Sequence, residues 1–218
     1  MERNRIYEHI DYTLLKPTAT SKDIFELCTK AQENNCASVC IPSHFVPFAS
    51  NFFPIRVCTV VGFPLGNSSI NTKIEEATKA VKNGASEIDM VMNISLFKEG
   101  NYQAVMEEID DLCVAVDNVM HEILLDEEII VKVIIETCYL TDEEIAIATR
   151  IVDNSCADYV KTSTGFGTRG ASFHDIEIIK ANIFNDKKIK ASGGIRTLED
   201  MEKYIEMGCN RIGASCLP

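Results

Sequence analysis

Short apolar runs rich in β-branched residues alternate with longer stretches of helical periodicity along the whole chain. The apolar runs are bounded by Gly, Pro, Asn or Ser, as strands commonly are. They predict eight strands, at residues 10–14, 37–42, 55–61, 86–92, 129–136, 157–162, 188–192 and 210–214. Strict alternation of strands and helices predicts a parallel sheet with crossover helices.

The helical stretches carry recognisable starts and ends. A hydroxyl residue followed three positions later by an acid predicts a capping box, and this pattern recurs at Thr20/Asp23, Thr72/Glu75, Thr141/Glu144, Ser172/Asp175 and Thr197/Asp200. Residues 101–121 place their apolar side chains on one face and predict the longest helix. Asn35, Gly84 and Gly208 follow helical stretches and suit a left-handed helix stop.

Eight strands with no linker or composition break favour a closed barrel over an open doubly wound sheet. We therefore predict a single (β/α)8 TIM barrel over residues 1–218. The 218 residues fall short of the roughly 250 that are typical, so the barrel should be compact. The sequence stops directly after the eighth strand, and we expect no closing C-terminal helix. Catalytic groups of such barrels lie where strands end, which directs attention to those positions.

Composition restricts the class of partner. A net charge of −12 argues against nucleic acid and against anionic membrane surfaces, since both require clustered Lys and Arg. A small phosphorylated substrate remains possible if backbone N–H groups form the anion site. The sequence contains no apolar run long enough to span a membrane and no signal-peptide pattern at its start. The nine cysteines include no C-x-x-C pair, so free thiols in a reducing, cytoplasmic compartment are expected.

Two consecutive predicted strands end in similar patterns, Tyr159–Gly165 and Ile189–Gly194. Each has a lysine inside an apolar run, Lys161 and Lys190, followed by small residues that leave room for a ligand. Burial and a cationic neighbour both disfavour the charged form of an amine, so the pair should lower the pKa of one lysine. A deprotonated lysine is a nucleophile toward carbonyl groups. The alternative is that both lysines extend to solvent at the strand ends.

The fourth predicted strand carries Asp89 in an otherwise apolar run. A buried carboxylate is costly unless it is paired, and the two lysines are the expected partners. Asp89 is therefore either an internal ion pair or a proton relay. Asp11 and Thr13 share a face of the first strand and should form a polar wall at the same mouth. Lys132 in the fifth strand is a lesser candidate.

Glycine-rich segments follow the last three strands: Gly165, Gly193–Gly194 and Gly213–Ser215. Barrels frequently bind phosphate at these positions, where backbone amides converge. Arg169 and Arg196 could add positive charge there. Residues 165–170 also match the dinucleotide motif G-x-G-x-x-G, but they follow the sixth strand rather than the first of a βαβ unit, which disfavours a nucleotide site.

Several long motifs resemble the deoxyribose-phosphate aldolase family. They occur in order from residue 11 to 215, across nearly the whole chain, as DYTLLKPTAT, ASVCIP, GFPLG, EIDMVMN, VKVIIETCYLTDEE, YVKTSTGFGT, IKASGGIRTLEDM and RIGAS. The resemblance implies a (β/α)8 fold and reversible cleavage of 2-deoxy-D-ribose 5-phosphate to acetaldehyde and D-glyceraldehyde 3-phosphate. It also implies that neither a metal nor an organic cofactor takes part.

The same resemblance assigns roles to residues. Lys161 is the Schiff-base lysine, Lys190 is the second lysine that tunes it, and Asp89 donates and accepts protons. Cys40 would line the aldehyde pocket. The complete set of predicted substrate-binding residues is Asp11, Thr13, Cys40, Thr164, Gly165, Gly193, Gly194, Gly213 and Ser215.

Two features depart from the family pattern. Arg169 stands where short-form members have glycine, and the sequence ends at Pro218, where members usually continue into a closing helix and some into a tail with a tyrosine. We expect apolar surface beside the eighth strand to be uncovered, and hence a homodimer or larger oligomer, or a marginally stable monomer.

Two other functions stay open at this stage. One is a different barrel lyase or isomerase acting on a sugar phosphate, in which the lysines contribute only charge. The other is a binding protein without catalytic activity that retains the phosphate site.

Overall fold

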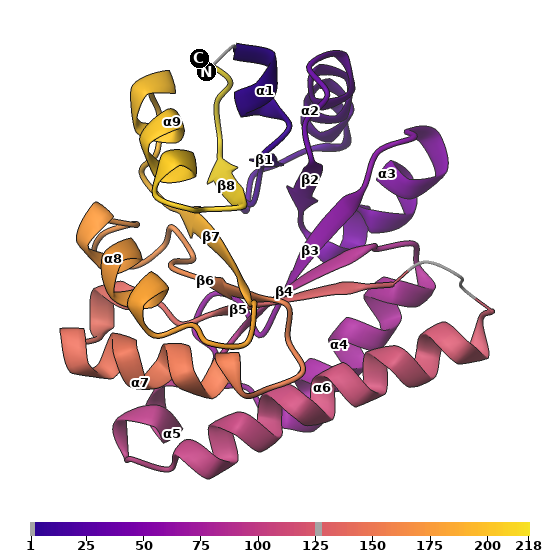
Figure 1. Ribbon diagram of the computed structural model, residues 1–218. Coiled ribbons are helices and arrows are strands. Elements are labelled where there is room, and N and C mark those ends of the chain that lie inside the picture. Colours follow the sequence, from indigo (N-terminus) through magenta and orange to yellow (C-terminus); the bar gives the residue numbers. More distant parts are fainter. Residues whose placement is uncertain (1–2, 125–127) are drawn as a thin grey trace.

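The computed structural model describes residues 3–124 and 128–218. Eight parallel strands close into a barrel in sequence order, and the last strand pairs with the first (Figure 1). They are β1 (Ile10–Thr13), β2 (Ser38–Ile41), β3 (Val57–Val61), β4 (Glu87–Val91), β5 (Ile130–Ile134), β6 (Tyr159–Lys161), β7 (Lys188–Ser192) and β8 (Arg211–Ala214). The predicted (β/α)8 architecture is confirmed, and most predicted strands are shortened at their ends.

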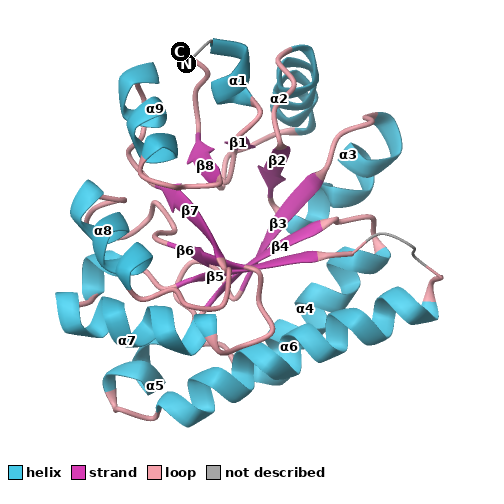
Figure 2. Cartoon of the chain, viewed as in Figure 1, coloured by secondary structure: helices cyan, strands magenta, loops and turns pink. Residues whose placement is uncertain are grey.

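The helices form an outer ring around this barrel (Figure 2). The α-helices are α1 (Arg3–Tyr7), α2 (Ser21–Glu33), α3 (Val46–Phe52), α4 (Ile70–Lys82), α5 (Ile94–Lys98), α6 (Tyr102–Glu122), α7 (Asp142–Asp153), α8 (Phe173–Ala181) and α9 (Leu198–Glu206). Two short 3-10 turns, η1 (Ser43–Phe45) and η2 (Thr137–Tyr139), follow β2 and β5. α6 is the longest helix, as predicted.

Four of the five predicted helix starts are confirmed. The hydroxyls of Thr20, Thr141, Ser172 and Thr197 each accept the backbone N–H three residues on. The prediction at Thr72 is wrong. Ser69 caps α4 instead, accepting from the Thr72 backbone N–H, and the helix begins at Ile70. A second hydroxyl one turn earlier gave the chain an alternative cap.

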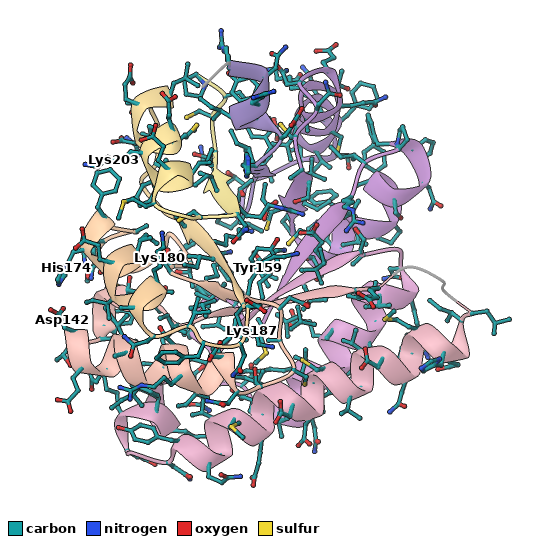
Figure 3. The ribbon with its side chains drawn as sticks, viewed as in Figure 1. Asp142, Tyr159, His174, Lys180, Lys187 and Lys203 are labelled. Atoms are coloured by element: carbon teal, nitrogen blue, oxygen red, sulfur yellow. The ribbon has the colours of Figure 1, made fainter. Side chains whose placement is uncertain are left out.

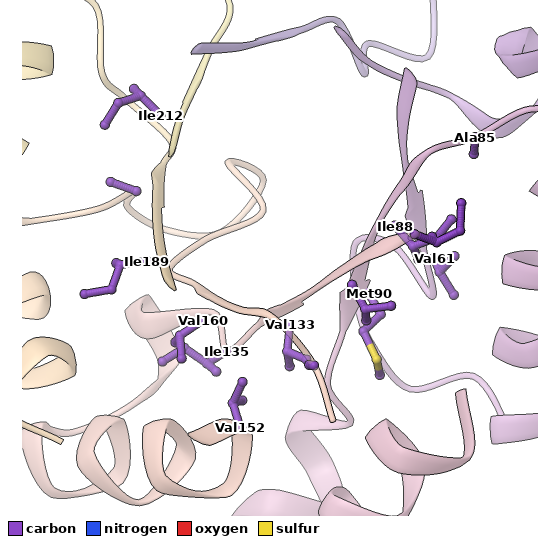
Figure 4. Packing of buried hydrophobic residues seen from close by; sticks show 14 of the residues in the cluster. Val61, Ala85, Ile88, Met90, Val133, Ile135, Val152, Val160, Ile189 and Ile212 are labelled. Atoms are coloured by element: carbon purple, nitrogen blue, oxygen red, sulfur yellow. The ribbon is translucent and has the colours of Figure 1, made fainter. Parts of the chain in front are cut away.

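The apolar core lies between the sheet and the helices rather than inside the barrel. Outward-facing strand residues such as Ile88, Val133, Val160 and Ile189 are buried against the helices (Figure 4). Side chains alternate between the two faces of a strand, so the positions between these residues point into the barrel. Many of the inward positions carry charge, and their side chains are buried as well. The barrel interior is therefore polar, and its charges must be paired.

The C-terminal residues run between α9 and α1 (Figure 1). The side chains of Arg3 and Tyr7 on α1 donate hydrogen bonds to the carbonyl oxygen of Pro218. The described residues after β8, 215–218, form no helix. The expectation of uncovered apolar surface on β8 is nevertheless wrong, because Ile212 and Ala214 are 0% and 2% exposed. The position of α1 between α9 and α2 accounts for part of this coverage.

Candidate active site

Lys161 and Lys190 stand side by side on neighbouring strands. They are direct partners in the β6–β7 register, and both side chains point into the barrel, where they are 3% and 0% exposed. The Nζ atom of each lies 2.7 Å from the same oxygen, Oδ2 of Asp89. The predicted convergence of two lysines and one aspartate is therefore present in the fold.

Asp89 on β4 is the centre of this arrangement. Its second oxygen, Oδ1, accepts from Lys132 at 2.9 Å and from the Cys58 thiol at 3.2 Å. Burial alone would raise the pKa of Asp89, but Lys132, Lys161 and Lys190 together hold this pKa well below its usual value. Asp89 is thus an ionised carboxylate that joins three lysine side chains.

Lys190 has a second carboxylate partner, Asp11 of β1, at 2.5 Å. Burial would lower the pKa of Lys190, but the charges of Asp11 and Asp89 outweigh it and raise this pKa above its usual value. The expectation that the lysine pair lowers the pKa does not hold for Lys190. Lys190 is a permanent cation, because it lies between two acids.

Lys132 is the third interior lysine, and its importance exceeds what the sequence suggested. It is 0% exposed and contacts Glu87 at 2.6 Å and Asp89 at 2.9 Å. These acids, despite burial, raise the pKa of Lys132 well above its usual value. Tyr159, labelled near the centre of Figure 3, is buried beside it, with its ring centre 5.9 Å from the Lys132 Nζ.

Arg211 of β8 completes the network and was missed in the sequence. Its guanidinium contacts Asp11 at 2.5 Å and Glu87 at 3.0 Å. The signal that could have found it is the one used for the lysines: a basic residue within an apolar strand, on the same face as Gly213. In the β7–β8 register Arg211 is the direct neighbour of Lys190.

The interior charges do not balance. Among the described residues, the network inside the barrel contains three acidic and four basic side chains, namely Asp11, Glu87, Asp89, Lys132, Lys161, Lys190 and Arg211. Arg56, which is 46% exposed, also lies 3.9 Å from Glu87 at the edge of this network. Lys161 has a single carboxylate partner, Asp89, and shares it with two other lysines.

A pocket of about 260 Å³ opens above these residues at the carboxyl ends of the strands. Of the three interior lysines, Lys161 alone lines it. Most of the predicted substrate-binding residues also line it, and these are Thr13, Thr164, Gly165, Gly193, Gly194, Gly213 and Ser215. Phe166 forms part of its wall and meets Phe63 of the opposite loop edge to face, with ring centres 5.3 Å apart.

Asp11 and Cys40 lie outside this lining. Both are 0% exposed, Asp11 in the charge network and Cys40 in a small apolar cluster with Cys58 and Val60. Sulfur atoms of Cys40 and Cys58 and an oxygen of Asp89 lie within 4.8 Å of one another. This set has the donor types of a metal site, but the Asp89 oxygens are held by lysine ammonium groups that a metal ion would have to displace.

The glycine-rich ends of β6 and β7 offer backbone donors. In the described chain, the N–H groups of Gly165, Gly193 and Gly194 donate to no protein acceptor. Lys16 and Arg196 add positive charge at the pocket. These features resemble a backbone cradle for an anion. The G-x-G-x-x-G match at residues 165–170 falls in the β6–α8 loop of a closed barrel, so it is not a dinucleotide fold.

Arg169 does not face the pocket lining. Its guanidinium holds Asp175, the acid of the α8 capping box, at 2.6 and 3.0 Å, and donates to the Thr137 carbonyl at 3.3 Å. Burial would raise the pKa of Asp175, but hydrogen bonds from Arg169, Thr137 and Ser172 lower it. The departure from glycine at this position therefore supplies a clamp between the β5 end and α8.

Comparison with known proteins agrees with this geometry. The model of the DeoC/LacD family of aldolases matches residues 8–217. The chain belongs to this aldolase family. A deoxyribose-phosphate aldolase of Thermoanaerobacter sp. strain X514 is 48% identical over 213 residues, which are 96% of this chain and 92% of that protein.

Solved structures give the same result. The aldolase QR15 has a TM-score of 0.89 at 39% identity, covering 96% of this chain and 91% of its own. The deoxyribose phosphate aldolase of Aeropyrum pernix, described as a unique tetramer, has a TM-score of 0.86 at 27% identity, covering 99% of this chain and 89% of its own.

Proposed function

We propose that this protein cleaves 2-deoxy-D-ribose 5-phosphate reversibly into D-glyceraldehyde 3-phosphate and acetaldehyde, with Lys161 forming the Schiff base. One observation carries the proposal: Lys161 is the interior lysine that reaches the pocket, and its Nζ lies 2.7 Å from a buried carboxylate. Family membership and relatives named for this reaction support it.

The chemistry begins at the substrate aldehyde. The neutral amine of Lys161 attacks C1 and water leaves, giving an iminium that withdraws electrons from the adjacent carbons. Removal of the proton from the C3 hydroxyl then breaks the C2–C3 bond, whose electron pair moves into the iminium to form an enamine. Glyceraldehyde 3-phosphate departs. Protonation of the enamine at C2 and hydrolysis of the new iminium release acetaldehyde and restore Lys161.

Asp89 and Lys190 are proposed to control proton transfer to and from Lys161. Oδ2 of Asp89 lies 2.7 Å from the Nζ atoms of both Lys161 and Lys190, so this carboxylate can take a proton from Lys161 and return it. Lys190 remains charged between its two acids, and it touches the same Asp89 oxygen as Lys161. Lys132 and Arg211 hold the other carboxylates, and thereby fix the side chain of Asp89.

The remaining predicted residues are proposed to bind the substrate. Thr13 lines the part of the pocket that would bind the donor aldehyde. The backbone N–H groups of Gly165, Gly193 and Gly194 would donate hydrogen bonds to the 5-phosphate. Gly213 and Ser215 complete that side of the pocket. Asp11 and Cys40 do not line the pocket and are proposed to support it indirectly. Asp11 does so as a member of the charge network, and Cys40 as a member of the apolar cluster.

An assay for acetaldehyde released from deoxyribose phosphate tests the proposal. Wild-type protein should release acetaldehyde and glyceraldehyde 3-phosphate in equal amounts, and Lys161→Arg should release neither. A barrel isomerase would convert the substrate without any acetaldehyde. A binding protein would leave it intact.

We further propose that the protein forms a homo-oligomer in the cytoplasm. Four phenylalanines gather on α2 and α3 or directly after α3, namely Phe25, Phe48, Phe52 and Phe53. Phe25 and Phe52 are 53% and 70% exposed, which is typical of a contact surface.

The proposed location in the cytoplasm is supported by the cysteines. All nine cysteines are free thiols, which is typical of a reducing compartment. In addition, no helix among the described residues is long and apolar enough to cross a membrane.

A further inference from the structure

Glu136 has an unfavourable backbone conformation at a buried position. It follows β5 with φ 52° and ψ 67°, in the left-handed region that side chains other than glycine disfavour. The other described non-glycine residues with positive φ, Asn35, Leu124 and Asp186, are all exposed, whereas Glu136 is 1% exposed. Buried strain of this kind persists where the surrounding structure enforces it, and often at functional sites.

The carboxylate of Glu136 is also unlike those of the charge network. In the described part of the chain, all the hydrogen bonds that it receives come from neutral groups. The Thr164 backbone N–H donates to its two oxygens at 3.2 and 3.3 Å, and the Thr164 hydroxyl donates a short bond. The Cys138 thiol lies 3.7 Å from Oε1. A buried carboxylate is tolerated only with such bonds, so Glu136 and Thr164 are tied together firmly.

These bonds shape the loop between β6 and α8. The Thr164 hydroxyl, oriented by Glu136, accepts from the Phe166 backbone N–H at 3.0 Å. Gly167 then passes so close that a Cβ there would lie 2.4 Å from the Cys138 Sγ and 3.3 Å from the Glu136 Cδ. The segment 164–167 is thus wrapped over the Glu136 side chain.

The far end of this loop is held independently. A Cβ on Gly170 would lie 2.0 Å from the carbonyl oxygen of Gly193, so the loop packs directly on the turn after β7. Gly165, between the two anchored ends, has φ 84° and lines the pocket. Its N–H donates to no protein acceptor among the described residues.

We propose that Glu136 is a positioning residue for the phosphate of the substrate: through Thr164 it fixes the β6–α8 loop so that the free N–H of Gly165 faces the pocket together with those of Gly193 and Gly194. The inference rests on the proposed function, since that function places a phosphate at these amides. Glu136 does not line the pocket, so it acts through Thr164 rather than on the substrate.

Two variants separate positioning from a structural role. Glu136→Gln keeps the shape but brings an amide NH2 toward the Thr164 hydroxyl, which must then change partners. Glu136→Gly removes the carboxylate and relieves the left-handed strain, so it should fold even if Glu136→Gln folds poorly. Asp186→Gly is the matched control, because it relieves a left-handed residue (φ 60°) that is exposed and precedes the amino end of β7, whereas the pocket lies at the carboxyl ends of the strands.

The first readout is binding of inorganic phosphate to the resting proteins, measured by titration calorimetry. Loss of one to two hydrogen bonds corresponds to about tenfold weaker binding, and we expect this for both Glu136 variants and not for Asp186→Gly. The second readout compares KM for deoxyribose phosphate and for unphosphorylated deoxyribose. The KM for the phosphorylated substrate should rise about tenfold, with kcat and the KM for deoxyribose little changed.

Unaltered phosphate binding in both Glu136 variants would overturn the inference, as would absence of phosphate binding to the wild-type protein. Equal losses for both substrates would also overturn it and leave Glu136 a structural residue. Release of acetaldehyde by the wild-type protein is scored separately, so failure of the proposed function is distinguishable from failure of this inference.

Discussion

At the scale of single residues, the site is a buried network in which each acid has at least two basic partners. Asp89 touches three lysines, and Asp11 and Glu87 each touch Arg211 and a lysine. The sequence could predict the central members, because a charged residue within an apolar strand is conspicuous. It could not show that Lys132 is as central as the other two lysines, and it gave no sign of Glu136. Both depend on contacts with residues far away in the chain, Glu87 and Asp89 for Lys132 and Thr164 for Glu136.

Replacing Asp89 by Asn removes a charge and retains the shape. The network would then hold two carboxylates against four cations, and breaking a buried pair in this way costs about 3–5 kcal/mol of unfolding free energy. Turnover should fall about 10²-fold, the usual scale for an acid–base group. Lys132 and Lys190 keep Glu87 and Asp11 as partners, so one buried amine is left without a carboxylate. Since such an amine loses its proton more readily, the stability deficit should narrow between pH 7 and pH 10. Urea unfolding at both pH values measures this, and a variant with wild-type stability and turnover would contradict it.

Replacing Lys190 by Leu tests how Lys161 is activated. In the wild-type protein two acids keep the pKa of Lys190 above its usual value, despite burial, so Lys190 stays charged throughout the working pH range. Lys190 shares Oδ2 of Asp89 with Lys161, so its removal changes the charge that faces the reacting amine. We expect activity at pH 7 to fall about 10²-fold and to recover partly by pH 9. A pH–rate profile identical to that of the wild-type protein would remove Lys190 from the mechanism.

At the scale of elements, strands and helix caps were largely predictable from local patterns. Thr20 and Thr141 cap their helices as expected because their partners lie three residues away in the chain. The error at Thr72 arose because a second hydroxyl residue, Ser69, lies three positions earlier and caps the helix instead. The function of Arg169 was likewise inaccessible from the sequence, because its partner carbonyl belongs to Thr137 on another loop.

Arg169→Gly tests the clamp between η2 and α8. Arg169 is one cause of the lowered pKa of Asp175. Its contribution to the free energy of unfolding is therefore fully present above the pKa of Asp175 in the unfolded chain, near 3.8. This contribution is lost as the pH falls through the lower pKa of Asp175 in the folded protein. At pH 7 the variant should lose about 1.5–3 kcal/mol, the range for hydrogen bonds to charged groups. The deficit should shrink below pH 4. Arg5→Ala, on the exposed face of α1, should leave stability unchanged, and an equal loss there would refute the clamp.

At the scale of the whole molecule, the barrel contains two different buried regions, one apolar and one charged. The apolar core lies between the sheet and the helices, and the charged side chains lie inside the barrel. Both regions arise because successive side chains along each strand point to opposite faces of the sheet. The barrel itself was predictable from eight regular repeats. The coverage of β8 was not, because α1 comes from the opposite end of the sequence and packs near α9.

The exposed phenylalanines of α2 and α3 test the proposed assembly. Phe52→Glu places a charge on the exposed aromatic surface and should shift the protein toward monomers in analytical ultracentrifugation. Phe184→Glu is the control, since Phe184 is 73% exposed but lies on the α8–β7 loop. If the wild-type protein is monomeric, or if both variants shift equally, this surface is not the interface.

The central claim is that Lys161 becomes covalently attached to the substrate. Borohydride reduces an iminium to a stable secondary amine, so acetaldehyde and borohydride together should inactivate the protein and leave an ethyl group on Lys161. Surface lysines stay protonated near pH 7 and should be spared at low reagent concentration, and Lys161→Arg should resist labelling. Peptide mass spectrometry should find the label on Lys161 in the segment YVKTSTGFGTR. A label on Lys190 instead, or turnover with no labelled lysine, would contradict the account.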